Sequence, residues 1–245
     1  MADHVLVETL SEPLNGATTA EIDIDSGTGN LTVDALPGDE QVLAAGTLQY
    51  GEHQGRPSRT VAANQGRATL TVKGRGTGRS WLRFPWAACT GATEWQIHQN
   101  PAVASDIRAH TGGGNVKLNL AGLAVSGLVA DTGGGNLDVV LPDGGASLRV
   151  SARTGAGNVT VEIGRGTTGS NAIDATSGAG NVVVRVPSGL AARVRATSGL
   201  GKVTVDSRFG KIDRSTYRSP DYDGAADRAE ITVHSGAGNV SVNTM

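Results

Sequence analysis

Apolar and polar residues alternate along most of this chain in short runs with a period of two. Examples are Val159-x-Val161-x-Ile163 and Val182-x-Val184-x-Val186. This period is typical of β-strands that bury one face, because successive side chains point to opposite sides of a strand. The pattern predicts an all-β protein whose core is formed by the apolar positions of these runs.

Many of the runs are joined in pairs by a glycine-rich bend. The bend has the pattern Ser/Thr-Gly-x-Gly-Asn/Lys-apolar and occurs seven times. Glycine tolerates backbone angles that other residues avoid, so the pattern indicates a tight corner between two strands. The predicted bend glycines are Gly27, Gly29, Gly112, Gly114, Gly133, Gly135, Gly155, Gly157, Gly178, Gly180, Gly199, Gly201, Gly236 and Gly238.

The bends recur at a nearly fixed spacing, which indicates a repeat architecture. Their fifth position falls at residues 115, 136, 158, 181 and 202, in steps of 21, 22, 23 and 21, and then at 239. Both a meander of antiparallel hairpins and a β-solenoid of stacked coils fit this unit. We favour the solenoid, because stacking places each corner about 4.8 Å from the next and so favours one bend sequence in every coil. The Asn side chains would then form a hydrogen-bonded ladder that Lys202 interrupts.

We therefore expect a single β-solenoid domain over residues 1–245, with two strands and about 21–23 residues per coil. Near the N-terminus, a stretch that contains Trp81, Phe84, Trp86 and Trp95 is expected to form an antiparallel cap, because repeat proteins need covered ends. The expected segments are a first coil (20–34), this cap (35–105), tandem coils (106–206), a polar loop excursion (207–230) and a last coil (231–245).

The composition excludes some kinds of partner and some kinds of site. The 21 Lys and Arg residues nearly balance the 23 Asp and Glu residues, which argues against a nucleic-acid partner. The one cysteine, Cys89, excludes an intrachain disulfide framework and a cysteine-based zinc site.

The chain contains no apolar stretch of 18 residues, and the acidic start from Met1 to Glu12 does not resemble a signal peptide. We expect no direct membrane insertion and, for the chain as given, a soluble cytoplasmic protein.

Motifs that resemble functional sites are weak. Ser198 to Lys202 resembles a phosphate-binding loop but lacks its earlier Gly and its following Ser or Thr, and Gly133 to Asp138 resembles a calcium-binding repeat without its nine-residue period. Asp23 and Asp25 lie on the same face of one predicted strand. Such a pair of carboxylates could serve a polysaccharide-cleaving site, because glycosidases use paired carboxylates. His110 and His234 are expected to face solvent. We predict no catalytic residue, no metal and no cofactor.

The seven bends, together with Trp95-x-Ile97-x-x-Asn100-Pro101, resemble the toast-rack and putative-adhesin group of bacterial β-solenoid proteins. That group includes the solenoid portions of cell-envelope stress regulators, and the likeness covers about Glu21 to Val242. The resemblance implies a solenoid without known catalysis that is extracytoplasmic or tethered to a membrane, so it favours the cell envelope as the location.

The leading interpretation is a non-enzymatic scaffold for protein–protein contact, with a role in cell-envelope stress regulation implied by the resemblance. The alternatives are a surface adhesin or carbohydrate-binding module and, third, a polysaccharide-active β-helix enzyme. Because no sequence remains to cover the last coil, we expect a homo-oligomer, most simply a two-fold dimer. Its contact residues are predicted to be Tyr217, Tyr222, Ile231, Val233, Val240 and Val242.

Overall fold

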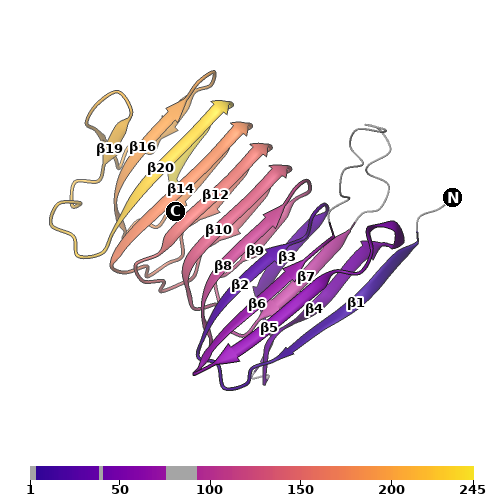
Figure 1. Ribbon diagram of the computed structural model, residues 1–245. Helices are drawn as coiled ribbons and strands as arrows, with labels where there is room; N and C mark the ends of the chain where they lie inside the picture. The colour runs from indigo at the N-terminus through magenta and orange to yellow at the C-terminus, as the bar shows by residue number, and fades with distance from the viewer. Residues whose placement is uncertain (1–3, 39–40, 76–92) are drawn as a thin grey trace.

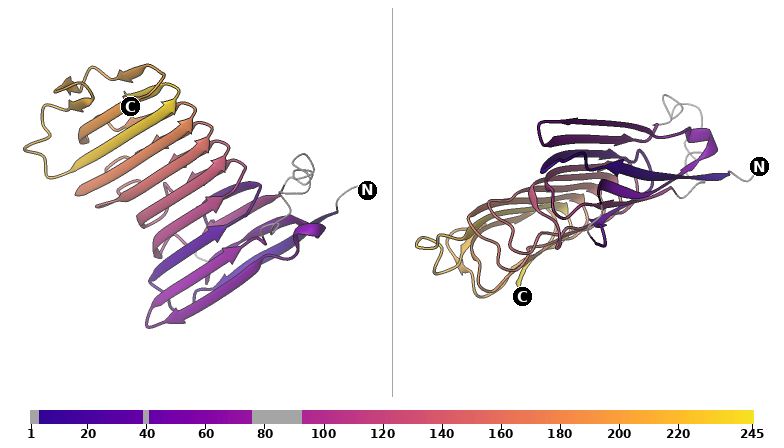
Figure 2. Two further views of the ribbon diagram at one scale, coloured as in Figure 1. Left: turned by 45° about the horizontal axis from the view of Figure 1, so that its top comes forward. Right: turned by 90° about the horizontal axis from the view of Figure 1, so that it is seen from below.

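The computed structural model describes residues 4–38, 41–75 and 93–245, whose regular secondary structure is β-strand apart from one short 3₁₀ helix. Sheet A has ten strands and runs from β1 to β17, whereas sheet B has eleven and runs from β5 to β18. Figure 1 and Figure 2 show the strands stacked side by side along one long axis, with the two sheets layered on each other. The all-β fold expected from the period-two pattern is confirmed.

Each coil contributes one strand to each sheet, and neighbouring coils pair in parallel and in register. Val139, for example, lies opposite Leu118 on one side and Val161 on the other. The parallel pairing excludes the hairpin meander and confirms the solenoid. The coils are β2 (Thr19–Asp25) with β3 (Asn30–Ala35), β8 (Ala104–Thr111) with β9 (Val116–Asn119), β10 (Val125–Gly134) with β11 (Leu137–Val140), β12 (Arg149–Ala156) with β13 (Val159–Glu162), β14 (Ser170–Ala179) with β15 (Val182–Val186), β16 (Ala191–Ser198) with β17 (Val203–Val205), and β20 (Arg228–Ala237) with β21 (Val240–Thr244).

The N-terminal end adds one more coil and then antiparallel strands. β6 (Arg67–Lys73) pairs in parallel with β2, and β7 (Glu94–Gln99) pairs in parallel with β3, so the two stack on the first coil. β5 (Ser58–Asn64) lies antiparallel to β6, and β4 (Val42–Gly51) lies antiparallel to β7. β1 (Val5–Pro13) pairs with β4 and ends sheet A.

The expected aromatic cluster is only partly described. Trp95 is buried in the core, at 1% exposure. Trp81, Phe84, Trp86 and Cys89 lie outside the described residues.

The last coil in the sequence is not the last coil in space. β20 lies between β14 and β16, and β21 lies between β15 and β17. In Figure 1 the yellow β20 separates the two orange strands. The expectation that this coil forms an open end of the solenoid is therefore wrong. Insertion gives both of its strands a hydrogen-bonded neighbour on each side, which an end coil lacks.

Residues 207–230 cover the sheet B strand of the coil that does end the stack, whereas β17 is the last strand of sheet A among the described residues. Within this segment β19 (Thr216–Arg218) pairs antiparallel with β16, and β18 (Gly210–Lys211) pairs with β19. Phe209 is buried against the core, and the guanidinium carbon of Arg208 lies 4.5 Å from the centre of its ring. The excursion is thus a cap that also carries the chain back to the gap between two earlier coils.

A ladder of Asn side chains follows this spatial order. The Oδ1 of Asn158 accepts a hydrogen bond from the backbone N–H of Asn181 at 2.9 Å, and the Oδ1 of Asn181 accepts one from Asn239 at 2.9 Å. The Oδ1 of Asn239 in turn accepts the N–H of Lys202 at 3.0 Å. Lys202 ends the ladder rather than interrupting it, because no described coil lies beyond it to donate another N–H.

Candidate functional site

The carboxylates considered as a catalytic pair make structural contacts. The Oδ2 of Asp23 lies 3.1 Å from the Nζ of Lys73, and the Oδ1 of Asp25 accepts the backbone N–H of Gly27 at 2.9 Å. Asp23 therefore joins β2 to β6, and Asp25 holds the first bend. In the part of the chain that the structure describes, no cluster of three or more His, Cys, Asp or Glu side chains could hold a metal ion.

The motif at Ser198 to Lys202 is the bend of the end coil. The Oγ of Ser198 accepts the N–H of Gly201 at 2.8 Å and donates to the carbonyl oxygen of Gly238 at 2.8 Å. These contacts close the corner and bind it to the neighbouring coil. The Gly133 to Asp138 motif is likewise the bend between β10 and β11.

The bend glycines lie where stacked corners approach most closely. Gly157 and Gly180 take φ angles of +140° and +148°. A Cβ on Gly157 would overlap the backbone carbonyl of Gly135, and a Cβ on Gly180 would overlap that of Gly157. Both positions therefore require glycine, because a side chain would collide with the neighbouring corner and because the φ angle is positive. The bends are thus structural elements.

The residues expected to join two copies lie inside the molecule or under its cap. The four apolar ones, which are Ile231, Val233, Val240 and Val242, are all buried between coils. The Tyr222 hydroxyl donates to the Oε1 of Glu230 at 2.8 Å, and burial raises the pKa of Tyr222. Tyr217 is half-buried, with the Nζ of Lys211 5.8 Å from its ring centre. The surface was predicted at this end because the coils were assumed to stack in chain order.

A run of three exposed apolar residues lies at the opposite end, on the edge strand β1. Val5, Leu6 and Val7 are exposed at 49%, 41% and 62%. They lie on the outermost strand of sheet A, whose outer side has no paired strand among the described residues.

The second half of β1 is protected by charges that reach across to the neighbouring sheet. Glu8 pairs with Arg56 at 2.7 Å, and Glu12 pairs with Arg59 of β5 at 3.5 Å. The hydrogen-bonded Arg56 guanidinium holds the pKa of Glu8 below its ordinary value. Inward-pointing charges discourage strand addition at a sheet edge, so the unprotected part of β1 is confined to its first residues.

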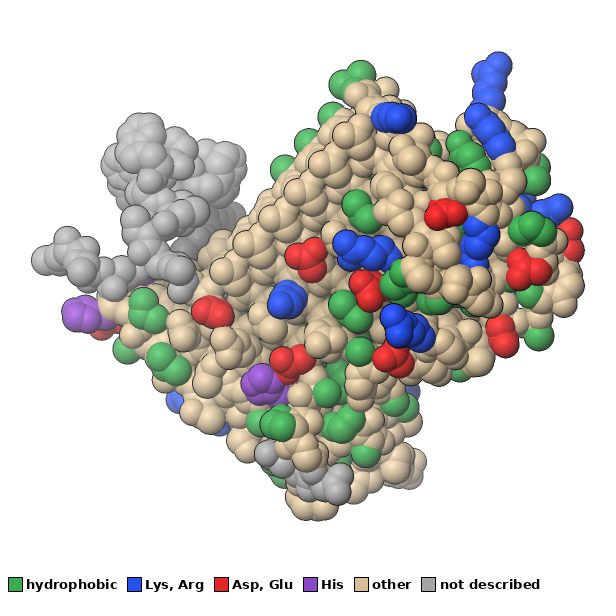
Figure 3. All heavy atoms as spheres, turned by 180° about the vertical axis from the view of Figure 1, so that it is seen from behind, with side chains coloured by type: hydrophobic (Ala, Val, Ile, Leu, Met, Phe, Trp, Pro, Cys, Tyr) green, Lys and Arg blue, Asp and Glu red, His purple; other side chains and the backbone are tan. Residues whose placement is uncertain are grey.

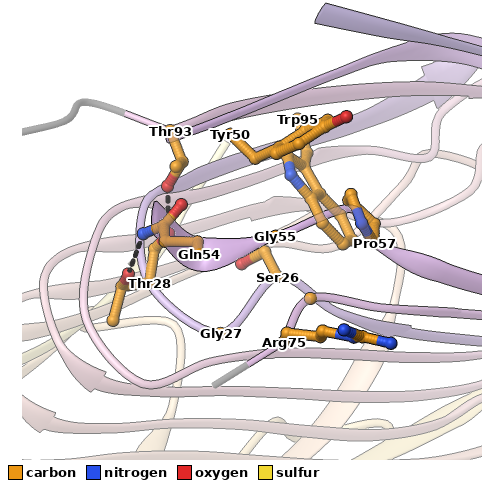
Figure 4. A pocket seen from close by; sticks show the side chains of 11 residues that line it. Ser26, Gly27, Thr28, Tyr50, Gln54, Gly55, Pro57, Arg75, Thr93 and Trp95 are labelled. Atoms are coloured by element: carbon orange, nitrogen blue, oxygen red, sulfur yellow. Dashed lines mark hydrogen bonds between the residues drawn. The ribbon is translucent and has the colours of Figure 1, made fainter. Parts of the chain in front are cut away.

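A pocket of about 220 Å³ opens next to this edge. Its walls come from the β2–β3 bend, the end of β4, η1 (Glu52–Gln54) and the segments next to β6 and β7. Figure 4 shows Tyr50 and Trp95 on one side of the pocket and Arg75 on the other, with the indole nitrogen turned towards the side of Gln54. Tyr50 pairs with Leu6 across β4 and β1, so the pocket adjoins the exposed edge.

Sequence reasoning missed this pocket. The inward position of Trp95 in its alternating run was readable, but nothing in the sequence brings Ser26, Tyr50 and Gln54 to it.

Comparison with known protein families decides the classification. The family described as the N-terminal domain of toast_rack, DUF2154, matches residues 3–162, which is more than half of the chain. The chain belongs to the toast-rack family. A comparison with curated proteins finds no match.

One solved structure supports this fold by its high structural similarity. The crystal structure of a putative cell adhesion protein from Clostridium sporogenes aligns with a TM-score of 0.72 and 18% identity, over 99% of this chain and 100% of that one. A putative adhesin from Bacteroides fragilis aligns over 98% of this chain and 97% of its own, with 12% identity and a TM-score of 0.34. At this identity the Clostridium structure supports the fold alone.

The outer face of this toast-rack protein carries charges of both signs. On the face that Figure 3 shows, Lys and Arg side chains are interspersed with Asp and Glu side chains. Arg185 and Glu162 form an ion pair between adjacent coils at 3.5 Å. This mixture does not form a groove of a single sign. Among the described residues there is no helix that is both long enough and apolar enough to cross a membrane.

Proposed function

We propose that this toast-rack protein is a non-enzymatic scaffold for protein–protein contact that acts through the edge of β1. The observation that carries the proposal is the apolar run Val5 to Val7 on the outermost strand of sheet A. The description of the Clostridium structure as a putative cell adhesion protein supports a role in surface contact.

An edge strand offers backbone donors and acceptors to an added strand. The burial of exposed apolar side chains stabilises the added strand further. Val5 and Val7 alternate with Leu6, so apolar side chains lie on both faces of this strand. An added strand would therefore cover apolar surface on both faces of sheet A.

The occupant of this edge is a second copy of the same chain, paired antiparallel about a two-fold axis. A register centred on Leu6 places Leu6 against its own copy and Val5 against Val7 of the partner. The same register places His4 against Glu8, so that an imidazole N–H of His4 can donate to the Glu8 carboxylate of the partner copy. The homo-oligomer expected from the sequence is thus proposed at the N-terminal end rather than at the last coil.

Light scattering on a size-exclusion column tests this proposal over a range of protein concentrations. The parent protein is expected to approach twice its chain mass of 24.8 kDa as the concentration rises. Val7→Lys is expected to remain monomeric, because a charge on the shared edge is left without a partner. The matched control is Val129→Lys, which alters a 40% exposed valine on the outer face of sheet B and should leave the dimer intact.

A parent protein that stays monomeric at every concentration overturns the β1 contact. A Val129→Lys variant that dissociates as fully as Val7→Lys would also overturn it, by placing the contact elsewhere.

The resemblance to cell-envelope stress regulators extends the proposal to a role in that response. A bacterial strain that carries Val7→Lys in place of the native chain is expected to show an altered envelope-stress reporter signal, with Val129→Lys as control. An unchanged signal in both strains contradicts this regulatory role and leaves the edge contact to be judged by light scattering.

A further inference from the structure

Two buried polar atoms at the pocket beside β1 have no hydrogen-bond partner among the described residues. They are the indole Nε1 of Trp95 and the Oγ of Ser26, on residues that are 1% and 6% exposed. Both residues line the pocket. Buried polar groups in folded proteins are nearly always satisfied, so two orphaned groups at one pocket point to a ligand that supplies their partners.

Both unpartnered groups at the pocket can donate a hydrogen bond. An indole N–H can only donate, and the Ser26 hydroxyl can donate as well. The Oε1 of Gln54 accepts the N–H of Gly51 at 3.0 Å, which uses one of its two lone pairs. The lining residues that the structure describes include no Asp or Glu. A ligand for this pocket must therefore supply acceptor atoms.

The pocket also holds one positive charge. Arg75 makes no ion pair or hydrogen bond with the described residues, and its side chain runs past Gly55, where a Cβ would lie 3.5 Å from the Arg75 Cδ. Figure 4 places it across the pocket from Tyr50 and Trp95. A guanidinium at a pocket that also holds donor groups favours a planar anion with two acceptor oxygens, which is the chemistry of a carboxylate.

We propose that this pocket binds a small organic carboxylate. The carboxylate oxygens accept from the Trp95 indole N–H and the Ser26 hydroxyl after a small shift of the pocket wall, because both atoms are closed to solvent in this structure, and the Arg75 guanidinium neutralises the charge. The rings of Tyr50 and Pro57 contact the carbon frame of the ligand. The volume lies below the roughly 300–1,000 Å³ of pockets for drug-sized molecules, so the ligand is a single small ring or its equivalent.

Titration of protein labelled with ¹⁵N in its tryptophan side chains tests the proposal. The probes are sodium D-glucuronate and sodium benzoate, with neutral D-glucose as a control of the same ring size as the sugar acid. The Trp95 indole resonance is assigned by its loss in Trp95→Phe. It is expected to shift and saturate with at least one acid and to stay unmoved with D-glucose. The acid that binds more tightly identifies the source as a sugar acid or an aromatic acid.

Variants of the donors provide the second arm of the experiment. Arg75→Gln is expected to raise the dissociation constant at least tenfold, and Ser26→Ala should raise it severalfold. Arg149→Gln, which changes an exposed arginine on β12, should leave it unchanged.

Three results overturn the proposal. They are an unmoved Trp95 resonance with both acids up to their solubility limits, D-glucose binding as tightly as the acids, and full affinity in Arg75→Gln. None of them depends on the oligomeric state, so the pocket and the β1 contact are tested separately.

Discussion

The backbone N–H of Lys202 donates to the Oδ1 of Asn239 at 3.0 Å, although 37 residues separate the two in the sequence. This bond joins the end coil to the inserted C-terminal coil. It shows why one bend carries Lys where the other six carry Asn. An Asn at each inner bend accepts the N–H of the next coil, whereas the end bend has no N–H to accept from the described strands.

The ladder predicts different effects for its inner and end positions. Asn158→Ala should lower the free energy of unfolding by about 0.5–1.5 kcal/mol, because it removes the acceptor of the Asn181 N–H. Lys202→Ala should change it by less than about 0.5 kcal/mol, since its backbone and not its side chain makes the ladder bond. Urea unfolding of both variants measures this difference, and equal losses would contradict the ladder.

The register of the coils predicts opposite outcomes at adjacent valines. Val184 is fully buried between Val161 and Val242, so Val184→Asp should prevent stable folding by burying an unpaired charge. Val183 lies on the outer face, and Val183→Asp should fold with a nearly unchanged melting temperature. Circular dichroism melts separate the two. A Val183→Asp variant as damaged as Val184→Asp would refute the register.

The bends allow the same comparison between two adjacent glycines. Gly135 has a φ of +135°, and a Cβ there would overlap the carbonyl of Gly114, so Gly135→Ala should cost more than about 1 kcal/mol. A Cβ on Gly134 would meet no atom within 4 Å, and Gly134→Ala should be neutral or slightly stabilising. Chemical denaturation of both variants is the measurement. Equal stability of the two would refute the close stacking of corners.

The Glu8–Arg56 pair predicts a small acid-sensitive contribution at the N-terminal end. The folded-state pKa of Glu8 is lowered, so the stability that it adds is present above its unfolded pKa and is lost as pH falls through the folded value. Glu8→Gln should therefore lose less stability than the parent on acidification from about pH 6 to pH 3, around the ordinary Glu pKa of about 4.3. Thermal melts across this range test it, with Glu52→Gln as the control. Identical acid dependence in Glu8→Gln and the parent would contradict the assignment.

Sequence alone predicted the coil but not the order of the coils. The period of two and the bend glycines specify which residues face inwards, and Val139, Val161 and Val184 lie where that period places them. The order is not specified in this way, because every coil presents similar small apolar residues and can stack on any other. The one readable sign of the end coil was Lys202 in place of Asn.

The candidate sites were also hard to predict, because they depend on which strands lie side by side. The pocket combines Ser26, Tyr50 and Trp95 from three separate segments, which the pairing of β7 with both β3 and β4 brings together. The apolar run at Val5 to Val7 was visible in the sequence, but its exposure depends on β1 being the outermost strand.

Disulfide trapping tests most directly whether the C-terminal coil is inserted between two earlier coils. In a Cys89→Ser background, Thr197→Cys with His234→Cys would join neighbouring strands, about 4.8 Å apart and within the roughly 4.4–6.8 Å that a disulfide spans. Thr176→Cys with Thr197→Cys would have to bridge about twice that distance across β20. On mild oxidation, followed by free-thiol titration and non-reducing electrophoresis, the first pair should cross-link and the second should not. Cross-linking of the Thr176 and Thr197 pair, with free thiols at Thr197 and His234, would contradict the inserted coil.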